Sequence, residues 1–193
     1  MTTADHLKKA FDGYCPLPIT FWNAVFELGE IVTIGKEIIV KKQNETEHYL
    51  NFLIHGSGGI LLWNKSNYIC TDLFLKGEFF CDYYSFIEQR PTPYEVLTFE
   101  KSVVFRVSYS NLISFTNEDE YGDKFWRYAI QALYLEKHNQ YIQSSIYTAE
   151  EIYQIMLEHQ PEIVQTIPQK YIASFLRITP QSLSRIRRIK KSD

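Results

Sequence analysis

The sequence predicts an α+β protein with three consecutive parts: an antiparallel β domain, a long helix and an all-helical C-terminal domain. Three observations predict this class. Short β-rich runs separated by turn clusters occupy residues 30–110, a heptad pattern extends from about Asn117 to Ser144, and the last quarter divides into helix, tight turn and helix. We therefore expect boundaries at 1–116, 117–144 and 145–193.

The composition is that of a folded protein, with 45% hydrophobic and 16% aromatic residues in a chain of 193. Cys15, Cys70 and Cys81 are odd in number and far apart, which argues against a disulfide framework or a zinc knuckle and favours a reducing compartment. Residues 1–10 lack the apolar stretch of a signal peptide, and no apolar run approaches the ~20 residues that span a bilayer. We expect a cytoplasmic protein with no membrane partner.

The first 28 residues predict a short helical segment, because an apolar helical face comes after the Pro16–Pro18 breaker. The β-rich runs come next, and a glycine-rich segment, 56–59, is expected to be a hairpin turn. Short strands with regular turns indicate an antiparallel roll, barrel or sandwich. The expected strands are Ile31–Ile34, Ile38–Lys42, Tyr49–His55, Ile60–Trp63, Tyr68–Leu75 and Val103–Ser108.

The long helix carries two apolar stripes. One repeats every seven residues with a second set offset by four, which is typical of the seam of a two-stranded coiled coil and predicts a homodimer. The other stripe, Trp126, Ile130 and Leu133, is expected to lie on the β domain. The alternative is a single amphipathic helix packed on its own core. The seam residues are Tyr121, Phe125, Tyr128, Ala132, Leu135, Asn139 and Ile142.

A new helix is expected after Thr148, where Thr-Ala-Glu-Glu is a good helix start, and Pro161 and then Pro168 interrupt the helical pattern. The segment Gln169–Arg188 predicts a helix-turn-helix. Thr179 can cap its second helix, with Pro180 at the first helical position. The residues expected to face inward are Ile172, Ala173, Leu176, Leu183 and Ile186.

The outward residues of this segment have the chemistry of a DNA-binding face. Arg185 can grip the O6/N7 edge of guanine, and Gln181 can pair with adenine. Hydroxyls, amides and cations placed around them suit phosphate oxygens, and Lys190 and Lys191 add sequence-independent attraction. The candidate DNA-binding residues are Gln169, Lys170, Thr179, Gln181, Ser182, Arg185 and Arg188.

The charge distribution points the same way. Residues 169–193 contain seven basic residues against Asp193 alone, a formal charge of +6; the whole chain carries −3, so the first 168 residues carry −9. A basic tail on an acidic body is expected of a sensor joined to a DNA-binding domain, although a solvated basic terminus would show the same asymmetry.

The C-terminal segment, with Thr148–Glu151 and PQKYIASFLRITPQSLSRIRR, resembles the Crp/Fnr family of bacterial transcription regulators, in particular the short members common in Bacteroidetes. Upstream, Lys36–Val40, Tyr49–Gly56 and Gly77–Phe80 are similar to the family's cyclic-nucleotide-binding β-roll. The resemblance implies a jelly-roll sensor, a dimerisation helix, and a homodimer on a palindromic site in double-stranded DNA, with RNA polymerase as a candidate further partner.

The sequence departs from this family in the phosphate cassette. The family uses a glutamate for the ribose and an Arg-Ser pair for the cyclic phosphate. Here Gly77 and Glu78 open the cassette, Asp82 takes the glutamate's place, and Thr92 and Pro93 replace the Arg-Ser pair. Proline has no amide N–H and threonine no charge, so we expect a degenerate pocket that holds another ligand or none, and no cofactor.

Three further expectations concern the cassette and the turn. Arg90 lies two residues before the position of the family's arginine, and a shifted loop would be needed to bring it to a phosphate. Aromatic residues around the cassette are candidates either for a planar ligand or for the core: Phe79, Phe80, Tyr83, Tyr84, Phe86 and Tyr94. Arg177 stands where the family often has glycine, at a cost of roughly 1 kcal/mol if the position is left-handed.

The printed sequence stops shortly after the second helix, without the family's wing. We therefore expect fewer phosphate contacts and a stronger dependence on dimerisation. No metalloprotease, P-loop or nucleophile-elbow motif is present, so an enzyme is not expected. The competing hypothesis is a ligand-binding or protein-interaction module whose helix-turn-helix does not bind specific DNA.

Overall fold

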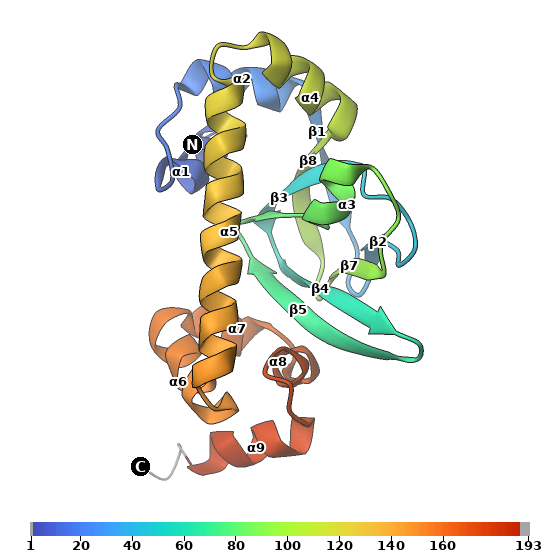
Figure 1. Cartoon of the computed structure of the whole chain (residues 1–193), viewed down its shortest axis with the longest axis vertical. Coiled ribbons are helices and arrows are strands. Elements are labelled where there is room, and N and C mark those ends of the chain that lie inside the picture. Colours follow the sequence, from blue (N-terminus) through green and yellow to red (C-terminus); the bar gives the residue numbers. More distant parts are fainter. Residues whose placement is uncertain (1, 190–193) are drawn as a thin grey trace.

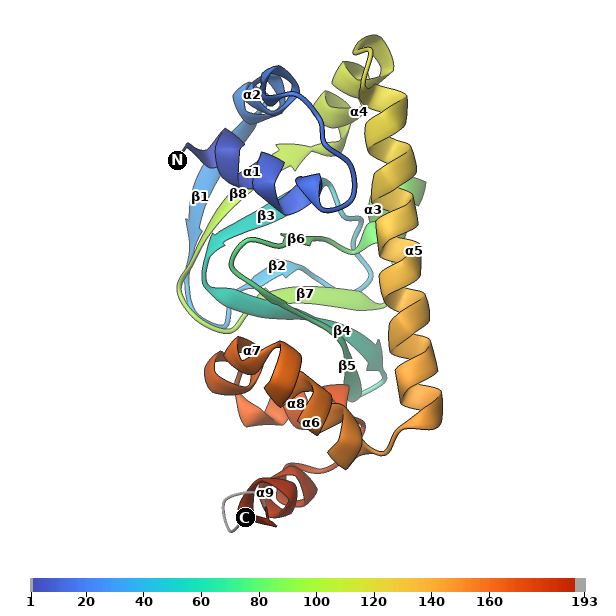
Figure 2. The same cartoon turned by 90° about the vertical axis from the view of Figure 1, so that its left-hand side faces the viewer.

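The computed structural model describes residues 2–189 and contains the three expected parts in order (Figure 1). Two four-stranded antiparallel sheets form an N-terminal roll, a single long helix runs along it, and the last helices lie below the roll. The predicted fold class is confirmed. In Figure 2 the roll and the C-terminal helices lie on the same side of the long helix, which forms one edge of the molecule.

The N-terminal segment folds as two helices, one on each side of the expected proline breaker. Helix α1 spans Thr3–Asp12 and begins with a capping box in which Thr2 and Asp5 each accept a backbone N–H from the other. Helix α2 spans Ile19–Glu27. Both bury aromatic and aliphatic side chains against the first sheet and the long helix, in a core that includes Phe21, Trp22, Phe105 and Phe125.

The roll is built from two sheets with the strand orders β1-β8-β3-β6 and β2-β7-β4-β5. Its interior is filled by Leu53, Ile60, Val96 and Val104 and by the stacked rings of Phe74 and Phe80, whose centroids are 4.1 Å apart. The strands are β1 (Gly29–Ile34), β2 (Ile39–Lys41), β3 (Tyr49–His55), β4 (Ser57–Asn64), β5 (Asn67–Leu75), β6 (Phe79–Phe80), β7 (Tyr94–Thr98) and β8 (Ser102–Ser108).

The expected hairpin turn over residues 56–59 is wrong. Only Gly56, with φ of +115°, makes the turn, and β4 begins at the next residue. The turn carries the chain from one sheet to the other, because β3 and β4 belong to different sheets. Beyond the expected strands the structure adds β6, β7 and a short helix, α3 (Tyr83–Glu88), between them.

The long helix begins later than expected. Helix α4 (Tyr109–Glu118) ends before it, and α5 spans Gly122–Ile146. The two helices meet at a tight corner, where a Cβ atom on Gly122 would overlap the carbonyl of Thr116. The indole N–H of Trp126 donates to Thr116 Oγ1 across this corner at 2.8 Å. The corner thus fixes the direction in which α5 leaves the roll.

Four helices complete the described chain: α6 (Ala149–His159), α7 (Pro161–Thr166), α8 (Gln169–Phe175) and α9 (Pro180–Ile189). The expected start at Thr148 is confirmed, with a capping box to Glu151. Helix α8 packs on β5, and the rings of Phe99 and Tyr171 stack with centroids 4.0 Å apart. None of the helices within residues 2–189 is long and apolar enough to cross a membrane.

Candidate nucleic-acid interface and ligand cassette

Helices α8 and α9 form the predicted helix-turn-helix, joined by a tight turn. The amide of Ile178 donates to the carbonyl of Ala173, and the amide of Arg177 donates to that of Ser174, each at 3.0 Å. This is a Schellman motif, and it places Arg177 in the left-handed region with φ of +57°. Thr179 Oγ1 then accepts the amide of Ser182 at 3.1 Å and caps α9 as expected.

The inward and outward faces of the motif are as predicted. The five expected inward side chains are all buried, with Ala173 and Leu183 at 0% exposed. On the outward face Gln181, Arg185 and Arg188 are exposed and Ser182 is half-buried. In both Figures 1 and 2, α9 is the element farthest from the roll. The face that carries Arg185 is therefore open to a large partner.

The candidate phosphate-binding residues of α8 lie in two different surroundings. Gln169 lines a shallow hollow with Ser184, Arg187 and Arg188 of α9. Lys170 instead lies over the ring of Tyr171, with its Nζ 3.7 Å from Glu37 Oε1 on the roll. Lys190 and Lys191, also named as phosphate contacts, lie outside the described residues.

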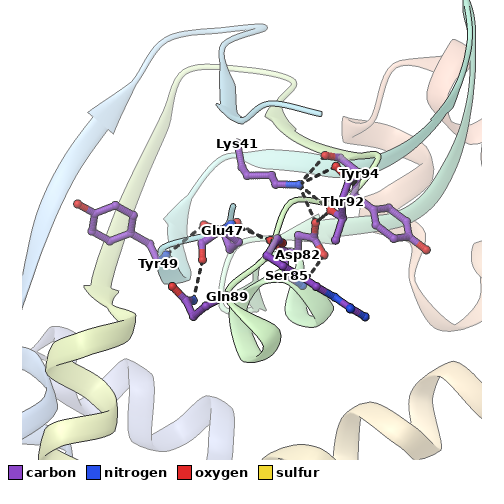
Figure 3. A network of polar contacts seen from close by, with 9 residues as sticks. Lys41, Glu47, Tyr49, Asp82, Ser85, Gln89, Thr92 and Tyr94 are labelled. Carbon is purple, nitrogen blue, oxygen red and sulfur yellow. Dashed lines mark hydrogen bonds and ion pairs between the residues drawn. The ribbon is translucent and has the colours of Figure 1, made fainter. Parts of the chain in front are cut away.

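A buried lysine from a strand distant in the sequence contacts two of the candidate cassette residues, Asp82 and Thr92 (Figure 3). Lys41, on β2, is 4% exposed and donates from Nζ to Asp82 Oδ2, Thr92 Oγ1 and the carbonyl of Tyr94, at 2.8 Å each. Thr92 Oγ1 is also hydrogen-bonded to Asp82. An ammonium group has three hydrogens, so these three acceptors use all of its donors.

A second buried carboxylate supports this cluster. Glu47 is 2% exposed, and its two oxygens accept the amides of Tyr49 at 3.1 Å and Asp82 at 3.4 Å. Burial raises the pKa of Glu47 to about 7, although these amides and Lys41 act against the rise. The nearby charge of Asp82 also raises the pKa of Glu47, and a proton on Glu47 relieves the repulsion between these two buried acids.

The remaining cassette candidates point elsewhere. Arg90 is exposed, and its guanidinium lies over the ring of Tyr84, 4.9 Å from the centroid. Gly77 is exposed with φ of +88°, and Glu78 accepts the amide of Leu75 at 2.8 Å. Asp82 and Thr92 both accept hydrogen bonds from Lys41, so their polar groups are already paired within the protein.

Lys41 is the cassette residue that the sequence did not suggest. It lies in a β-rich run like any strand lysine, about forty residues before Asp82. Its role depends on the register of β2 against β7, in which Lys41 pairs with Val96. The sequence offers no clear signal for it, because Lys41 is the last residue of β2 and is followed by the exposed Lys42.

The predicted dimer seam needs a correction. Phe125 is 3% exposed and belongs to the core that α5 shares with α1 and α2, so it cannot face a second chain. Tyr121 and Tyr128 also pack against this core. In the second stripe, Trp126 does lie on the core, but Ile130 is 51% exposed. In its first turns α5 therefore packs against the core of its own chain with residues that the heptad pattern had assigned to the dimer seam.

Farther along α5 an apolar surface is exposed. Leu135 and Ile142, both predicted seam residues, are 50% and 38% exposed. Ala132 and Asn139 instead line a cavity between α5 and the rest of the molecule. The exposed large apolar residues of this surface, which we call the α5 stripe, are Ile130, Tyr134, Leu135, Tyr141, Ile142 and Ile146.

The aromatic residues near the cassette differ widely in burial. Phe80 and Phe86 are buried in the core, whereas Tyr84 is 51% exposed. All three cysteines are free and buried, and burial raises the pKa of the Cys81 thiol well above its usual value, as expected of an unreactive thiol. No group of three or more His, Cys, Asp or Glu within residues 2–189 is arranged to hold a metal ion.

No family model matches this chain, and no curated protein matches it. Solved structures do. The c-di-GMP responsive regulator CLP of Xanthomonas campestris superposes with a TM-score of 0.69 at 14% identity, covering 91% of this chain and 93% of that one. FixK2 from Bradyrhizobium japonicum gives 0.71 at 16% identity, covering 85% of each chain.

The catabolite activator protein of Thermus thermophilus is more distant, with a TM-score of 0.57 at 11% identity, covering 95% of this chain and 86% of that one. These structural neighbours are Crp/Fnr regulators with the cyclic-nucleotide-binding fold. The similarity extends over the roll, the long helix and the C-terminal helices. The resemblance seen in the sequence is thus confirmed for the fold of almost the whole chain.

Proposed function

We propose that this chain, which has the fold of the Crp/Fnr regulators, is a DNA-binding transcription regulator that acts as a homodimer on a palindromic site. Its cyclic-nucleotide cassette is degenerate, so the roll responds to another ligand or to none. It acts in the cytoplasm and is not an enzyme.

The observation that carries the DNA-binding role is the outward face of α9. Gln181 and Arg185 are exposed, and the buried side chains on the opposite face of the helix fix its orientation. A helix presented in this way enters the major groove, where the arginine fork matches guanine. Two copies related by a dimer axis through α5 would contact half-sites one helical turn apart, about 34–36 Å.

The first experiment is a selection of random duplex DNA on the purified full-length protein, with binding to the selected site then measured at several salt concentrations. We expect a palindromic site and a steep decrease of affinity with salt, because phosphate contacts release counterions. Enrichment of no site would support the competing hypothesis of an interaction module that does not bind specific DNA.

Arg185→Ala tests the chemistry of the face. We expect a loss of about 1–3 kcal/mol of binding free energy and relaxed specificity at one base pair of each half-site. Arg90→Ala is the matched control, since it removes the same charge from an exposed position on the roll. Equal effects of the two substitutions would argue that only net charge matters and would count against a specific contact by Arg185.

The cassette is tested separately by calorimetry with cAMP and cGMP. The donors of Lys41 are already used and Pro93 has none to offer, so we expect no heat of binding at micromolar nucleotide and no change in DNA affinity. Tight binding of either nucleotide would overturn the degenerate cassette while leaving the DNA-binding proposal intact.

A further inference from the structure

A cavity of about 680 Å³ lies between α5 and the rest of the molecule. Its volume is in the range of small-molecule sites. Ala132 lines it from α5, residues 77–81 from the mouth of the roll, Met156 from α6 and Ile163 from α7. We call it the junction cavity, because the sensor, the long helix and the DNA-binding domain all contribute to its wall.

Much of the wall is aromatic. Phe79, which is half-buried, lines it from the roll, and Phe74, Phe80 and Phe86 border it with rings that are at most 4% exposed. The hydroxyl of Tyr83, also in the wall, is buried and has no hydrogen-bond partner among the described residues. A buried hydroxyl without a partner is costly, and a ligand would reach it only if the wall shifted to expose it.

The polar part of the wall is acidic. Asp72, Glu78 and Glu136 contribute carboxylates. Lys137 Nζ lies 2.6 Å from Asp72 Oδ2 and 3.7 Å from Glu136 Oε1, so a single cation offsets the pair. Partial desolvation at the cavity wall and the charges of its neighbours raise the pKa of Glu78 to about 7. The side chain of Glu78 remains accessible to solvent, and hence to a small molecule.

We propose that the junction cavity binds a small organic cation with an apolar, ring-sized body, its ammonium group beside the carboxylates of Glu78 and Glu136. An aromatic amine has this chemistry. The aromatic wall would take the ring and favour a nearby cation, while the carboxylates would repel an anion of the same shape.

Such a ligand would contact three parts of the molecule at once. It would touch Phe79 on the roll, Ala132 on α5 and Met156 on α6, so it would favour the arrangement of these parts that fits it best. This consequence rests on the proposed function, because it predicts a change in DNA affinity. Binding itself does not depend on DNA.

Three indoles of similar size and different charge provide the probe: tryptamine, 3-methylindole and indole-3-acetate. Calorimetry on the full-length protein should give tryptamine an affinity at least about tenfold higher than that of 3-methylindole, with indole-3-acetate the weakest. Equal affinities would overturn the cationic preference. No binding of any of the three at millimolar concentration would overturn the site.

Two kinds of variant test separately the negative charge of the cavity wall and the volume of the cavity. Glu78→Gln with Glu136→Gln should lower tryptamine affinity at least about tenfold and leave 3-methylindole unchanged. Ala132→Phe should weaken both, with circular dichroism to check folding, and Glu118→Gln, exposed on α4, should change neither. If the double Gln variant binds tryptamine as the wild type does, the proposal is wrong. If the protein binds tryptamine but selects no DNA site, the cavity proposal holds and the proposed function as a transcription regulator is wrong.

Discussion

Arg177 occupies a position that favours glycine. With φ of +57° in a Schellman turn, its Cβ meets the steric penalty that glycine avoids. We expect Arg177→Gly to raise the free energy of unfolding by up to about 1 kcal/mol, and Arg177→Ala to give no such gain. Urea unfolding of the three proteins checks this. Equal stability of the Gly and Ala variants would mean that the turn relaxes without strain.

Glu47 gives the protein a definite pH dependence. Burial raises its pKa to about 7 from the ordinary 4.5, so between these pH values the folded chain keeps a proton that the unfolded chain has lost. The free energy of unfolding must therefore fall as pH rises through this window, on the order of 2–3 kcal/mol for this group. Below about 4.5 both states are protonated and the dependence vanishes.

Glu47→Gln keeps a carbonyl acceptor and has no proton to lose. We expect it to flatten the decline in stability between pH 5 and pH 8, measured by urea unfolding at one-unit steps. Glu45→Gln, exposed two residues earlier, should leave the slope unchanged. Glu78, whose pKa is also raised to about 7, should account for part of the slope that remains. An unchanged slope in Glu47→Gln would contradict the assignment.

Among the elements, α9 was the easiest to predict and α5 the hardest. The turn of the helix-turn-helix is encoded locally, by Thr179 and Pro180 at the start of α9 and by apolar residues at helical spacing. The heptad of α5 is also local, but which stripe faces the roll depends on the corner at Gly122 and on α1 and α2, which pack against Phe125. Such distant contacts leave no mark on the periodicity.

Strand β7 and the Lys41 contact show the same limit in the roll. Residues 94–98 come directly after Pro93 and show no clear alternation of polar and apolar residues, yet they pair with two strands. The cassette substitutions at Thr92 and Pro93 were visible in the sequence. The contact between Lys41 and Thr92 was not, because strand register is a property of the folded sheet.

The α5 stripe predicts where two chains meet. Leu135→Glu with Ile142→Glu should weaken a dimer at least about 100-fold, since each buried leucine-sized side chain contributes about 1.5–3 kcal/mol. Sedimentation at micromolar protein measures this. Ile31→Glu, at a similarly exposed apolar position on β1, is the control. A dimer that survives the double change would place the interface away from this stripe.

At the scale of the whole molecule, the roll and the C-terminal helices share one core. Leu61 and Phe99 of the roll lie in the same buried cluster as Tyr171 and Ile172 of α8. Ser174 Oγ accepts the amide of Cys70 on the edge strand β5 at 2.9 Å. These contacts tie the position of the helix-turn-helix to the roll without passing through α5.

This shared core predicts cooperative unfolding. Of the three tryptophans, Trp22 and Trp126 belong to the core around α1, α2 and α5, whereas Trp63 packs against the shared core, so in a Trp63→Phe background the fluorescence reports on the roll and α5. We expect Tyr171→Ala to cost about 3–5 kcal/mol and to shift the fluorescence and far-ultraviolet transitions together. A helical transition that moves while the fluorescence transition stays in place would show that the two domains unfold independently.

The order of synthesis gives the shared core a consequence in the cell. Phe99 leaves the ribosome before Tyr171, and at about 5–20 residues per second roughly 4–15 s pass before the covering helix exists. During that interval the nascent roll presents its apolar outer face uncovered. The growing chain should therefore be a client of ribosome-associated chaperones until α8 has been made.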